Sequence, residues 1–232
     1  MLRVAVAPVE IGVLAHLDAP PPWFGASERV RWPTLAPAAR AAFVESRALL
    51  RRLLHASTGV DAACWDVSAE AGTEPLVRLA GSSAAPPRAS LSHRRGWVAA
   101  AASNGAVGID LELAQTACSD PLERASLMLS PAELEDWTTL APDLRELALL
   151  TRWAVKEAWF KACPTQSSAW DFRRVVACAC APERANVRAW AAPPLHVAVS
   201  CSDAQALAVV HCEGLLADEA HSSFWQVGLA VS

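Results

Sequence analysis

The 232-residue sequence is poor in lysine: it contains only Lys156 and Lys161, against 18 arginines. A coding preference for Arg would explain why Lys is rare, but not why the two lysines lie within six residues of each other. Lys carries a compact point charge, whereas Arg presents a planar fork. The pair therefore predicts a site that needs a point charge in a confined space, with chance clustering as the alternative.

Several other features are missing from the sequence. No uncharged apolar run reaches 18 residues, so no membrane-spanning helix is expected. The net charge of −4 gives no sign of a nucleic acid or an anionic membrane as a partner. Pro8 and Glu10 interrupt the apolar N-terminal stretch, which argues against a secretory signal. The seven cysteines do not form two pairs at zinc-site spacing. These absences predict a cytoplasmic protein with small, buried, reduced thiols.

Hydrophobic residues make up 53% of the chain, which predicts a large core in one large domain or two small ones. The patterns predict helices over 38–57, 130–140 and 142–162. They predict strands over 2–14, 64–67, 76–79, 97–103, 106–112, 174–180, 186–191 and 224–231, a hairpin over 195–212, and loops over 18–37 and 114–121. A weak similarity between 89–102 and 195–212 suggests two copies of one unit, 1–106 and 107–232, unless the hairpins merely look alike.

The stretch from Ser90 to Glu112 carries the clearest local signals. Asn104-Gly105 lies between two apolar runs, which predicts a tight hairpin. Because side chains alternate along a strand, Asp110 and Glu112 would point to one face, opposite to Ile109 and Leu111. Two such carboxylates repel each other unless a cation lies between them, and their oxygens suit Mg²⁺. The alternative is an ordinary solvated strand end.

A second group of charges lies near the end of the helix predicted over 142–162. Trp153, Glu157 and Lys161 are spaced four apart and share one stripe, with Lys156 beside it. A surface ion network would also give this pattern. The large apolar residues around the charges instead favour partial burial, where charged groups need partners or a ligand.

The helix predicted over 38–57 carries three arginines on one face. Arg40, Arg47 and Arg51 follow at spacings of seven and four residues. The row could face a phosphate group or simply be solvated, and the sequence leaves both interpretations open.

Three separated motifs resemble the signature motifs of the 4′-phosphopantetheinyl transferases: S-L-S-H at 90–93, G-I-D-L-E at 108–112 and W-A-V-K-E-A-W-F-K at 153–161. They are most similar to the larger, surfactin-synthetase-activating type, in which a pseudo-duplicated chain works as a monomer. The segments Arg47–Arg51 and Ser130–Glu133 fit as well. Together the matches cover the middle two-thirds of the chain.

This resemblance implies an α+β fold in which two similar halves pack their small sheets together, with coenzyme A in the cleft between them. It implies an enzyme that transfers the 4′-phosphopantetheine arm of coenzyme A to a serine of an acyl or peptidyl carrier protein. The other product would be adenosine 3′,5′-bisphosphate. Which carrier is served stays open.

The resemblance also implies roles for the charged residues. Asp110, Glu112 and Glu157 would hold Mg²⁺ against the diphosphate of coenzyme A. Glu157, or a water on the metal, would take the proton of the incoming serine. Lys161 would neutralise charge at the diphosphate and help the leaving group depart. Lys156 would be either a second phosphate contact or a structural cation.

The nucleotide end of coenzyme A would meet a different set of residues. His93, after Ser92, would lie at the 3′-phosphate, and Arg47 and Arg51 are weaker candidates for the same phosphate cluster. The chain departs from the family at Gly72–Pro75, where many relatives carry Gly-Lys-Pro or Gly-Arg-Pro and this sequence has an acid and an extra residue.

Two arginines are candidates to replace the missing cation, Arg88 and Arg94. Arg94 itself is a departure, because Ser-His-Arg stands where Ser-His-Ser is common in the family. The altered Gly-x-Pro region motivates one alternative function, a non-catalytic module that binds coenzyme A or a carrier protein. A Mg²⁺-dependent hydrolase of the coenzyme A diphosphate is a second alternative.

Overall fold

The computed structural model describes residues 1–9, 18–68, 70, 73–79, 81–82, 85–114, 120–163, 171–208, 210–214, 216 and 222–230. The strands are β1 (Leu2–Pro8), β2 (Trp65–Val67), β3 (Val77–Leu79), β4 (Arg88–Arg94), β5 (Trp97–Ser103), β6 (Val107–Leu113), β7 (Val175–Ala179), β8 (Val187–Ala192), β9 (Leu195–Cys201), β10 (His211–Gly214) and β11 (Ser222–Leu229). The helices are α2 (Ala26–Arg31), α3 (Pro37–Thr58), α4 (Pro121–Met128), α5 (Pro131–Thr139), α6 (Pro142–Ala162) and α7 (Ala204–Ala208).

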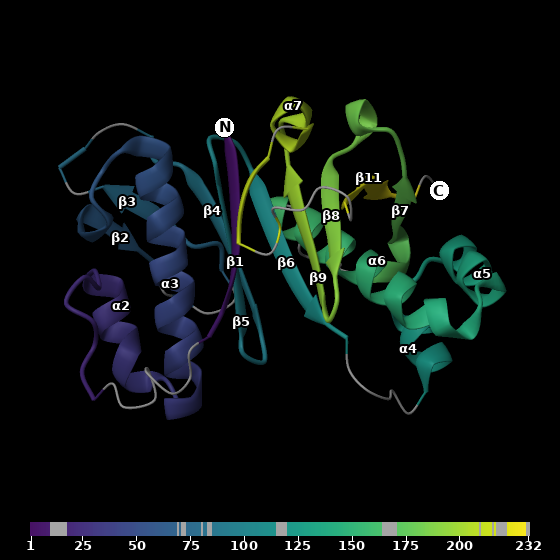
Figure 1. The fold of residues 1–232 in the computed structure, drawn as a ribbon, viewed down its shortest axis with the longest axis horizontal. Helices are drawn as coiled ribbons and strands as arrows, with labels where there is room; N and C mark the ends of the chain where they lie inside the picture. Colours follow the sequence, from purple (N-terminus) through teal and green to yellow (C-terminus); the bar gives the residue numbers. More distant parts are fainter. Residues whose placement is uncertain are drawn as a thin grey trace.

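Two larger sheets form the centre of the molecule (Figure 1). The first sheet has the strand order β10-β1-β5-β4, and the second has the order β6-β9-β8-β11-β7. The strands β2 and β3 form a separate small sheet beside α3. The fold is therefore α+β, as expected.

The layers follow the order helix, sheet, sheet, helix (Figure 1). One apolar cluster lies between the two sheets and contains Val4 and Ala101 from the first, and Ile109, Leu111 and Val199 from the second. Further clusters fill the space between α3 and the first sheet, and between α6 and the second sheet. Both long helices thus bury one apolar face, which is the source of most helix stability in proteins.

Several predicted helix signals are confirmed. The helix α3 ends where Gly59 adopts a left-handed conformation with φ of 73°, as expected for a residue without a side chain. Ser130 caps α5, and Glu133 completes the capping box by accepting a hydrogen bond from the Ser130 amide at 2.8 Å. The helix predicted over 142–162 is α6. Residues 10–14 of the predicted first strand lie outside the described residues.

The predicted hairpin at Asn104-Gly105 is wrong, although both of its strands exist. β5 pairs with β4 through a turn at Gly96, whose φ of 83° needs a glycine, and β6 pairs with β9. Asn104-Gly105 instead carries the chain from the first sheet into the second. The two predicted strands are therefore confirmed, but the inner faces of β5 and β6 pack against each other across two sheets.

The predicted hairpin over 195–212 is also wrong. After β9 the chain forms α7, and β10 then crosses to the first sheet, where it lies parallel to β1. The hairpin partner of β9 is β8. The region predicted as loop over 114–121 ends in α4, an unexpected helix whose N-cap Asp120 accepts a hydrogen bond from the Glu123 amide at 2.9 Å. The division of the chain at 106/107 stays a prediction. β10 belongs to the predicted second part of the sequence but lies in the first sheet, beside β1.

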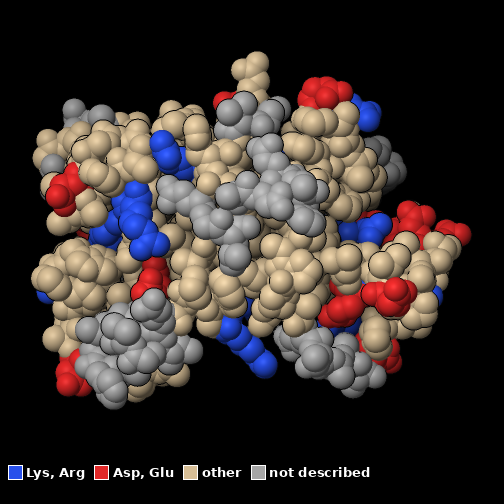
Figure 2. Space-filling model, in the orientation of Figure 1, with Lys and Arg blue, Asp and Glu red and all other residues tan. Residues whose placement is uncertain are grey.

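Charge is spread unevenly over the surface. In the view of Figure 2, basic side chains gather over α3, and acidic side chains gather over α4 and α5. No helix in the described part of the chain is long and apolar enough to cross a lipid bilayer.

Candidate functional site

The site is built where β4 and β6, the edge strands of the two sheets, run side by side. Two serine side chains join them: Ser90 Oγ accepts from the Ile109 amide at 3.0 Å, and Ser92 Oγ accepts from the Leu111 amide at 3.2 Å. Ser92 Oγ also donates to Asp110 Oδ1 at 3.0 Å. The serine hydroxyls therefore replace a backbone ladder along this seam and hold β6 in register with β4.

Asp110 and Glu112 lie on the face of β6 that the sequence predicts. Ile109 and Leu111 are fully buried between the sheets, whereas Asp110 is 4% exposed on the α6 side. Lys161 Nζ, in the last turn of α6, donates to Asp110 Oδ1 at 2.6 Å and to the Ile109 carbonyl at 3.1 Å. The β6 acid Asp110 and the second lysine are thus in direct contact.

Gly108 allows α6 to approach β6 this closely. A Cβ atom at residue 108 would lie 2.0 Å from the Ala158 carbonyl oxygen and 2.6 Å from the Ala162 amide nitrogen, both in the backbone of α6. Real side chains cannot occupy that space, so any residue other than glycine would push the last turn of α6, and Lys161 with it, away from Asp110.

The carboxylate of Glu112 is buried and paired with Arg94. Arg94 Nε donates to Oε2 at 3.0 Å and Nη2 donates to Oε1 at 2.6 Å, so the guanidinium fork matches both oxygens. Burial is the main cause that raises the pKa of Glu112, and the charge of Asp110 adds to it. The Arg94 pair and a hydrogen bond with Trp153 act in the opposite direction.

Glu157 lies on α6, one turn before Lys161, and is half-buried. Burial raises its pKa first, followed by the charge of Asp110, and the charge of Glu112 contributes as well. Lys161 and Arg94 oppose the shift. The charge of Asp110 thus contributes to the pKa shifts of both glutamates, and such a group of acids is unfavourable unless positive charge is held among them.

The donor set at this point fits a hard cation. Asp110 Oδ2 is buried and accepts no hydrogen bond, so one carboxylate oxygen is left without a partner in an apolar setting. In the described ranges, however, no three His, Cys, Asp or Glu side chains are arranged as a ready metal cluster. Arg94 and Lys161 supply the positive charge instead. The ligation of Mg²⁺ by Asp110, Glu112 and Glu157 therefore stays a prediction.

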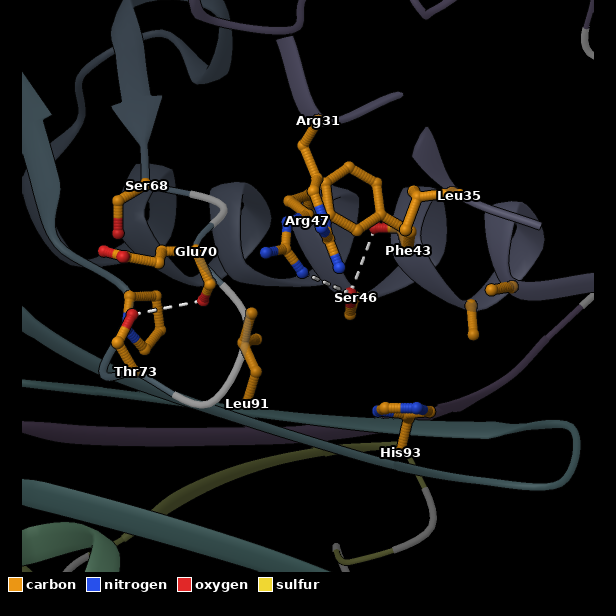
Figure 3. A pocket seen from close by; sticks show the side chains of 13 residues that line it. Arg31, Leu35, Phe43, Ser46, Arg47, Ser68, Glu70, Thr73, Leu91 and His93 are labelled. Atoms are coloured by element: carbon orange, nitrogen blue, oxygen red, sulfur yellow. Dashed lines mark hydrogen bonds between the residues drawn. The ribbon is translucent and has the colours of Figure 1, made fainter. Parts of the chain in front are cut away.

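A cavity of about 290 Å³ lies on the other side of His93, between α3 and β4 (Figure 3). His93 points into it from β4, and Phe43 and Arg47 face His93 from α3, with Arg31 beside them. Reduced solvation lowers the pKa of His93, and the charges of Arg94, Lys161 and Arg47 lower it further. The pKa of His93 thus depends on cations of both the cavity and the carboxylate site, and His93 lies between these two parts.

Arg47 is the main cation of this cavity. Its guanidinium lies 3.9 Å from the centre of the Phe43 ring, and its Nη1 donates to Ser46 Oγ at 3.2 Å. Burial lowers the pKa of Arg47 to about 10, Glu28 opposes this, and Arg51 and Arg31 lower it further. A half-buried cation that is crowded by other cations favours a bound anion.

Arg51 does not reach the cavity. Its side chain is 1% exposed, and its two terminal nitrogens donate to Glu28 Oε1 at 2.8 Å and Oε2 at 2.5 Å. One of them also donates to the Trp65 carbonyl at 2.9 Å. The predicted phosphate contact of Arg51 is therefore corrected. The charge of Arg51 is paired with Glu28, and this pair links α3 to α2. Arg40, on the predicted cationic face, lies over the Trp32 ring.

Lys156 is likewise a structural cation, the second of the two roles predicted for it. It is fully buried, and its Nζ donates to Glu133 Oε2 at 2.5 Å, to the Met128 carbonyl at 2.9 Å and to the Phe172 carbonyl at 3.2 Å. All three ammonium donors are used, so Lys156 has no donor left for a phosphate.

The altered Gly-x-Pro region gives one more correction. Gly72 lies outside the described residues, but Glu74 takes both side-chain hydrogen bonds of Arg88, the first at 2.5 Å. Of the two replacement cations, only Arg94 therefore lies beside the carboxylates.

The sequence reasoning missed Arg31 as a wall of the cavity and Glu28 as the partner of Arg51. Both come from α2, which lies within the proline-rich region predicted as mostly loop. The acid at the third position of a short helix was the available signal, since Glu28 accepts from the Gly25 amide at 2.8 Å.

Comparison with known proteins gives a family match and matches among solved structures. The family model of the 4′-phosphopantetheinyl transferase superfamily matches residues 106–210. Among solved structures, the holo-(acyl-carrier-protein) synthase (AcpS) of Thermotoga maritima matches at 23% identity and a TM-score of 0.32, over 40% of this chain and 60% of that one. The match thus spans less than two-thirds of that synthase. No curated protein sequence matches the chain.

The matched segment contains β6 and α6, and with them Asp110, Glu112, Glu157 and Lys161. Residues 106–210, slightly less than half of the chain, are thus similar to the 4′-phosphopantetheinyl transferase superfamily.

Proposed function

We propose that the protein transfers the 4′-phosphopantetheine arm of coenzyme A to a serine of an acyl or peptidyl carrier protein. The observation that carries the proposal is the meeting of Asp110, Glu112, Glu157 and Lys161 at the seam of the two sheets, beside a cavity with crowded positive charge. The serine hydroxyl oxygen forms a bond to the phosphorus next to the pantetheine arm, and the bridging P–O bond of the diphosphate breaks. Adenosine 3′,5′-bisphosphate leaves with the bonding electrons.

Asp110, Glu112 and Glu157 are the residues that would hold Mg²⁺. Support comes from the unpaired Asp110 Oδ2 and from the acidic neighbours that raise the pKa values of Glu112 and Glu157. When bound, Mg²⁺ supplies positive charge to the diphosphate, which is the main requirement of phosphoryl-type transfer.

Glu157 is also the residue that would accept the serine proton. In the metal-free protein, burial and the charge of Asp110 raise its pKa, and a bound Mg²⁺ would lower it again. Lys161 is 29% exposed on its side chain and keeps one ammonium hydrogen beyond its two hydrogen bonds. That hydrogen is available to a diphosphate oxygen, where it stabilises the charge of the leaving group.

The cavity between α3 and β4 is the proposed place of the nucleotide. His93, Arg47 and Arg31 line it, and together they favour an anionic group such as the 3′-phosphate. Because His93 lies between this cavity and the carboxylates, the nucleotide and the diphosphate of one coenzyme A molecule would contact both parts of the site. We also propose that the protein works as a monomer, since one chain supplies every residue of the site.

The decisive experiment is to incubate the protein with Mg²⁺, coenzyme A and an apo carrier protein, and then to weigh the carrier by mass spectrometry. We expect a gain of one phosphopantetheine arm with the wild type and none with Glu157→Gln. Breakdown of coenzyme A in the absence of a carrier would favour the hydrolase. Binding of coenzyme A without either reaction would favour the binding module.

A further inference from the structure

Arg94 occupies an unusual position for a surface arginine. It is the last residue of β4, its side chain is 48% exposed, and its fork is hydrogen-bonded to both oxygens of Glu112, which is 9% exposed. A bidentate pair with a buried carboxylate is far more ordered than a typical surface ion pair. Arg94 thus closes the solvent side of one of the three proposed metal ligands.

The charge of Arg94 acts on all three carboxylates. The hydrogen bonds with Glu112 are the main cause that raises the pKa of Arg94, and the charges of Asp110 and Glu157 raise it as well. Arg94 in turn opposes the upward pKa shifts of Glu112 and Glu157. The guanidinium therefore provides the neutralising charge that a divalent cation would bring to the same acids.

Lys161 and Arg94 differ in the number of carboxylate oxygens that each one contacts. Lys161 contacts only Oδ1 of Asp110 and leaves Oδ2 bare, so a cation can reach Asp110 while Lys161 stays in place. Arg94 uses both oxygens of Glu112, so a cation that binds Glu112 must share these oxygens with the guanidinium or displace it.

There is room for that movement. A second cavity of about 320 Å³ is lined by His93, Arg94, Arg95 and Leu113. A released Arg94 side chain can turn into this space without displacing the core. From there its free fork can bind a phosphate oxygen, which is the anion geometry that arginine matches best.

We propose that Arg94 is an internal counter-ion that competes with the divalent cation for Glu112. Metal binding frees Arg94, and the freed guanidinium binds the anionic substrate, so that metal and substrate strengthen each other's binding. This inference rests on the proposed function, because it takes Glu112 as a metal ligand and a diphosphate as the substrate.

The test measures Mn²⁺ binding without coenzyme A, by the electron paramagnetic resonance signal of free Mn²⁺. The variants are Arg94→Ala, Arg94→Lys and, as a matched control on the same turn, Arg95→Ala. We expect Arg94→Ala to tighten Mn²⁺ binding by about 5-fold or more, within the usual range of coupling between sites. Arg94→Lys keeps the charge but loses the fork, so it should fall between the wild type and Arg94→Ala.

Arg95→Ala removes an equal charge from an exposed side chain that no carboxylate in the described site holds, and should change Mn²⁺ affinity by less than about 2-fold, as expected for a screened surface charge. Unchanged or weaker Mn²⁺ binding by Arg94→Ala overturns the inference, and so does an equal gain by Arg95→Ala. Thermal unfolding of each variant confirms that it is folded.

The same samples enter the carrier-weighing assay with Mg²⁺. If the wild type transfers the arm but Arg94→Ala binds Mn²⁺ no better, only the role of Arg94 is lost. If the wild type transfers nothing while Arg94→Ala still binds Mn²⁺ more tightly, the proposed function fails and the competition for Glu112 stands.

Discussion

The two long helices, α3 and α6, each contain a buried ion pair of the same kind. Each carries one fully buried cation that is paired with a glutamate from a short helix: Arg51 with Glu28 of α2, and Lys156 with Glu133 of α5. Each glutamate also accepts a hydrogen bond from the backbone amide at the start of its own helix. Each long helix then carries a second, less buried cation toward the site.

The difference between the cations within each helix lies in their partners rather than in their type. Lys156 donates to three oxygens and is closed to ligands, whereas Lys161, five residues later, donates to two and remains partly exposed. Arg51 is 1% exposed and held by both oxygens of Glu28, while Arg47 faces the cavity. The cations that lie toward the site are therefore the ones whose side chains stay partly accessible. Two copies of one unit would leave such a parallel, and the duplication stays a prediction.

The largest expected effect is on stability, and it separates the two lysines. Lys156→Met leaves the buried Glu133 charge without its partner and should lower the free energy of unfolding by about 3–5 kcal/mol. Urea denaturation measures this change. Lys161→Met is the matched control and should change stability much less, since Lys161 is partly exposed. Equal losses in both variants would mean that the two lysines do not differ as described.

The next effect is on activity, which should depend on Lys161 much more than on Lys156. Lys161→Met and Asp110→Ala remove charge from the proposed reaction centre and should lower the rate of phosphopantetheine transfer roughly 10²–10³-fold. Lys156→Met, assayed at a temperature where it stays folded, should keep most of the wild-type rate. Initial rates from carrier mass measurements decide the point. Near-normal transfer by Asp110→Ala would remove it from the proposed metal ligands.

A smaller effect tests how closely α6 must approach β6. Gly108→Ala introduces a Cβ that would lie 2.0 Å from the Ala158 carbonyl, so α6 must shift. We expect a loss of about 1–3 kcal/mol in the free energy of unfolding, as for other overpacked sites. Because Lys161 moves with α6, transfer should fall by up to about 10²-fold. Ala substitution at Gly81, where no atom lies within 4 Å, is the crowding control, although its positive φ adds some strain.

The smallest effect concerns the metal-free protein and pH. Burial and Asp110 raise the pKa of Glu157 above 4.5, so folding favours its protonated form. That contribution is complete below about pH 4.5 and is lost as the pH rises through the raised value, which leaves a penalty at pH 8. Glu157→Gln should therefore have the higher Tm at pH 8 in a chelator, and the difference should shrink toward pH 4. A Tm difference that grows on acidification would contradict the raised pKa.

The local elements of the fold were largely predictable, but their partners were not. Residues 97–103 and 106–112 read as strands from their own pattern, yet their assignment to different sheets depends on Ser90, Ser92 and β9, which lie elsewhere in the sequence. The helix α4 was missed because its eight residues follow a segment without periodicity.

The candidate site shows the same limit. The motifs indicated Asp110, Glu112, Glu157 and Lys161 together, and the structure places these side chains at one seam. Helical spacing could not separate Arg47 from Arg51, because the residue that distinguishes them, Glu28, belongs to a different helix. Sequence periodicity gives the face on which a charge lies, but only the tertiary fold determines which charges are already neutralised.

The crossing of β10 into the first sheet has a consequence for how the chain is made. β1 leaves the ribosome well before β10, the strand that covers its outer edge. During synthesis that edge stays open to pairing with other chains, which exposes the nascent protein to aggregation. Cutting the gene between β1 and β10 would make this exposure permanent, so truncations should keep both strands in one chain.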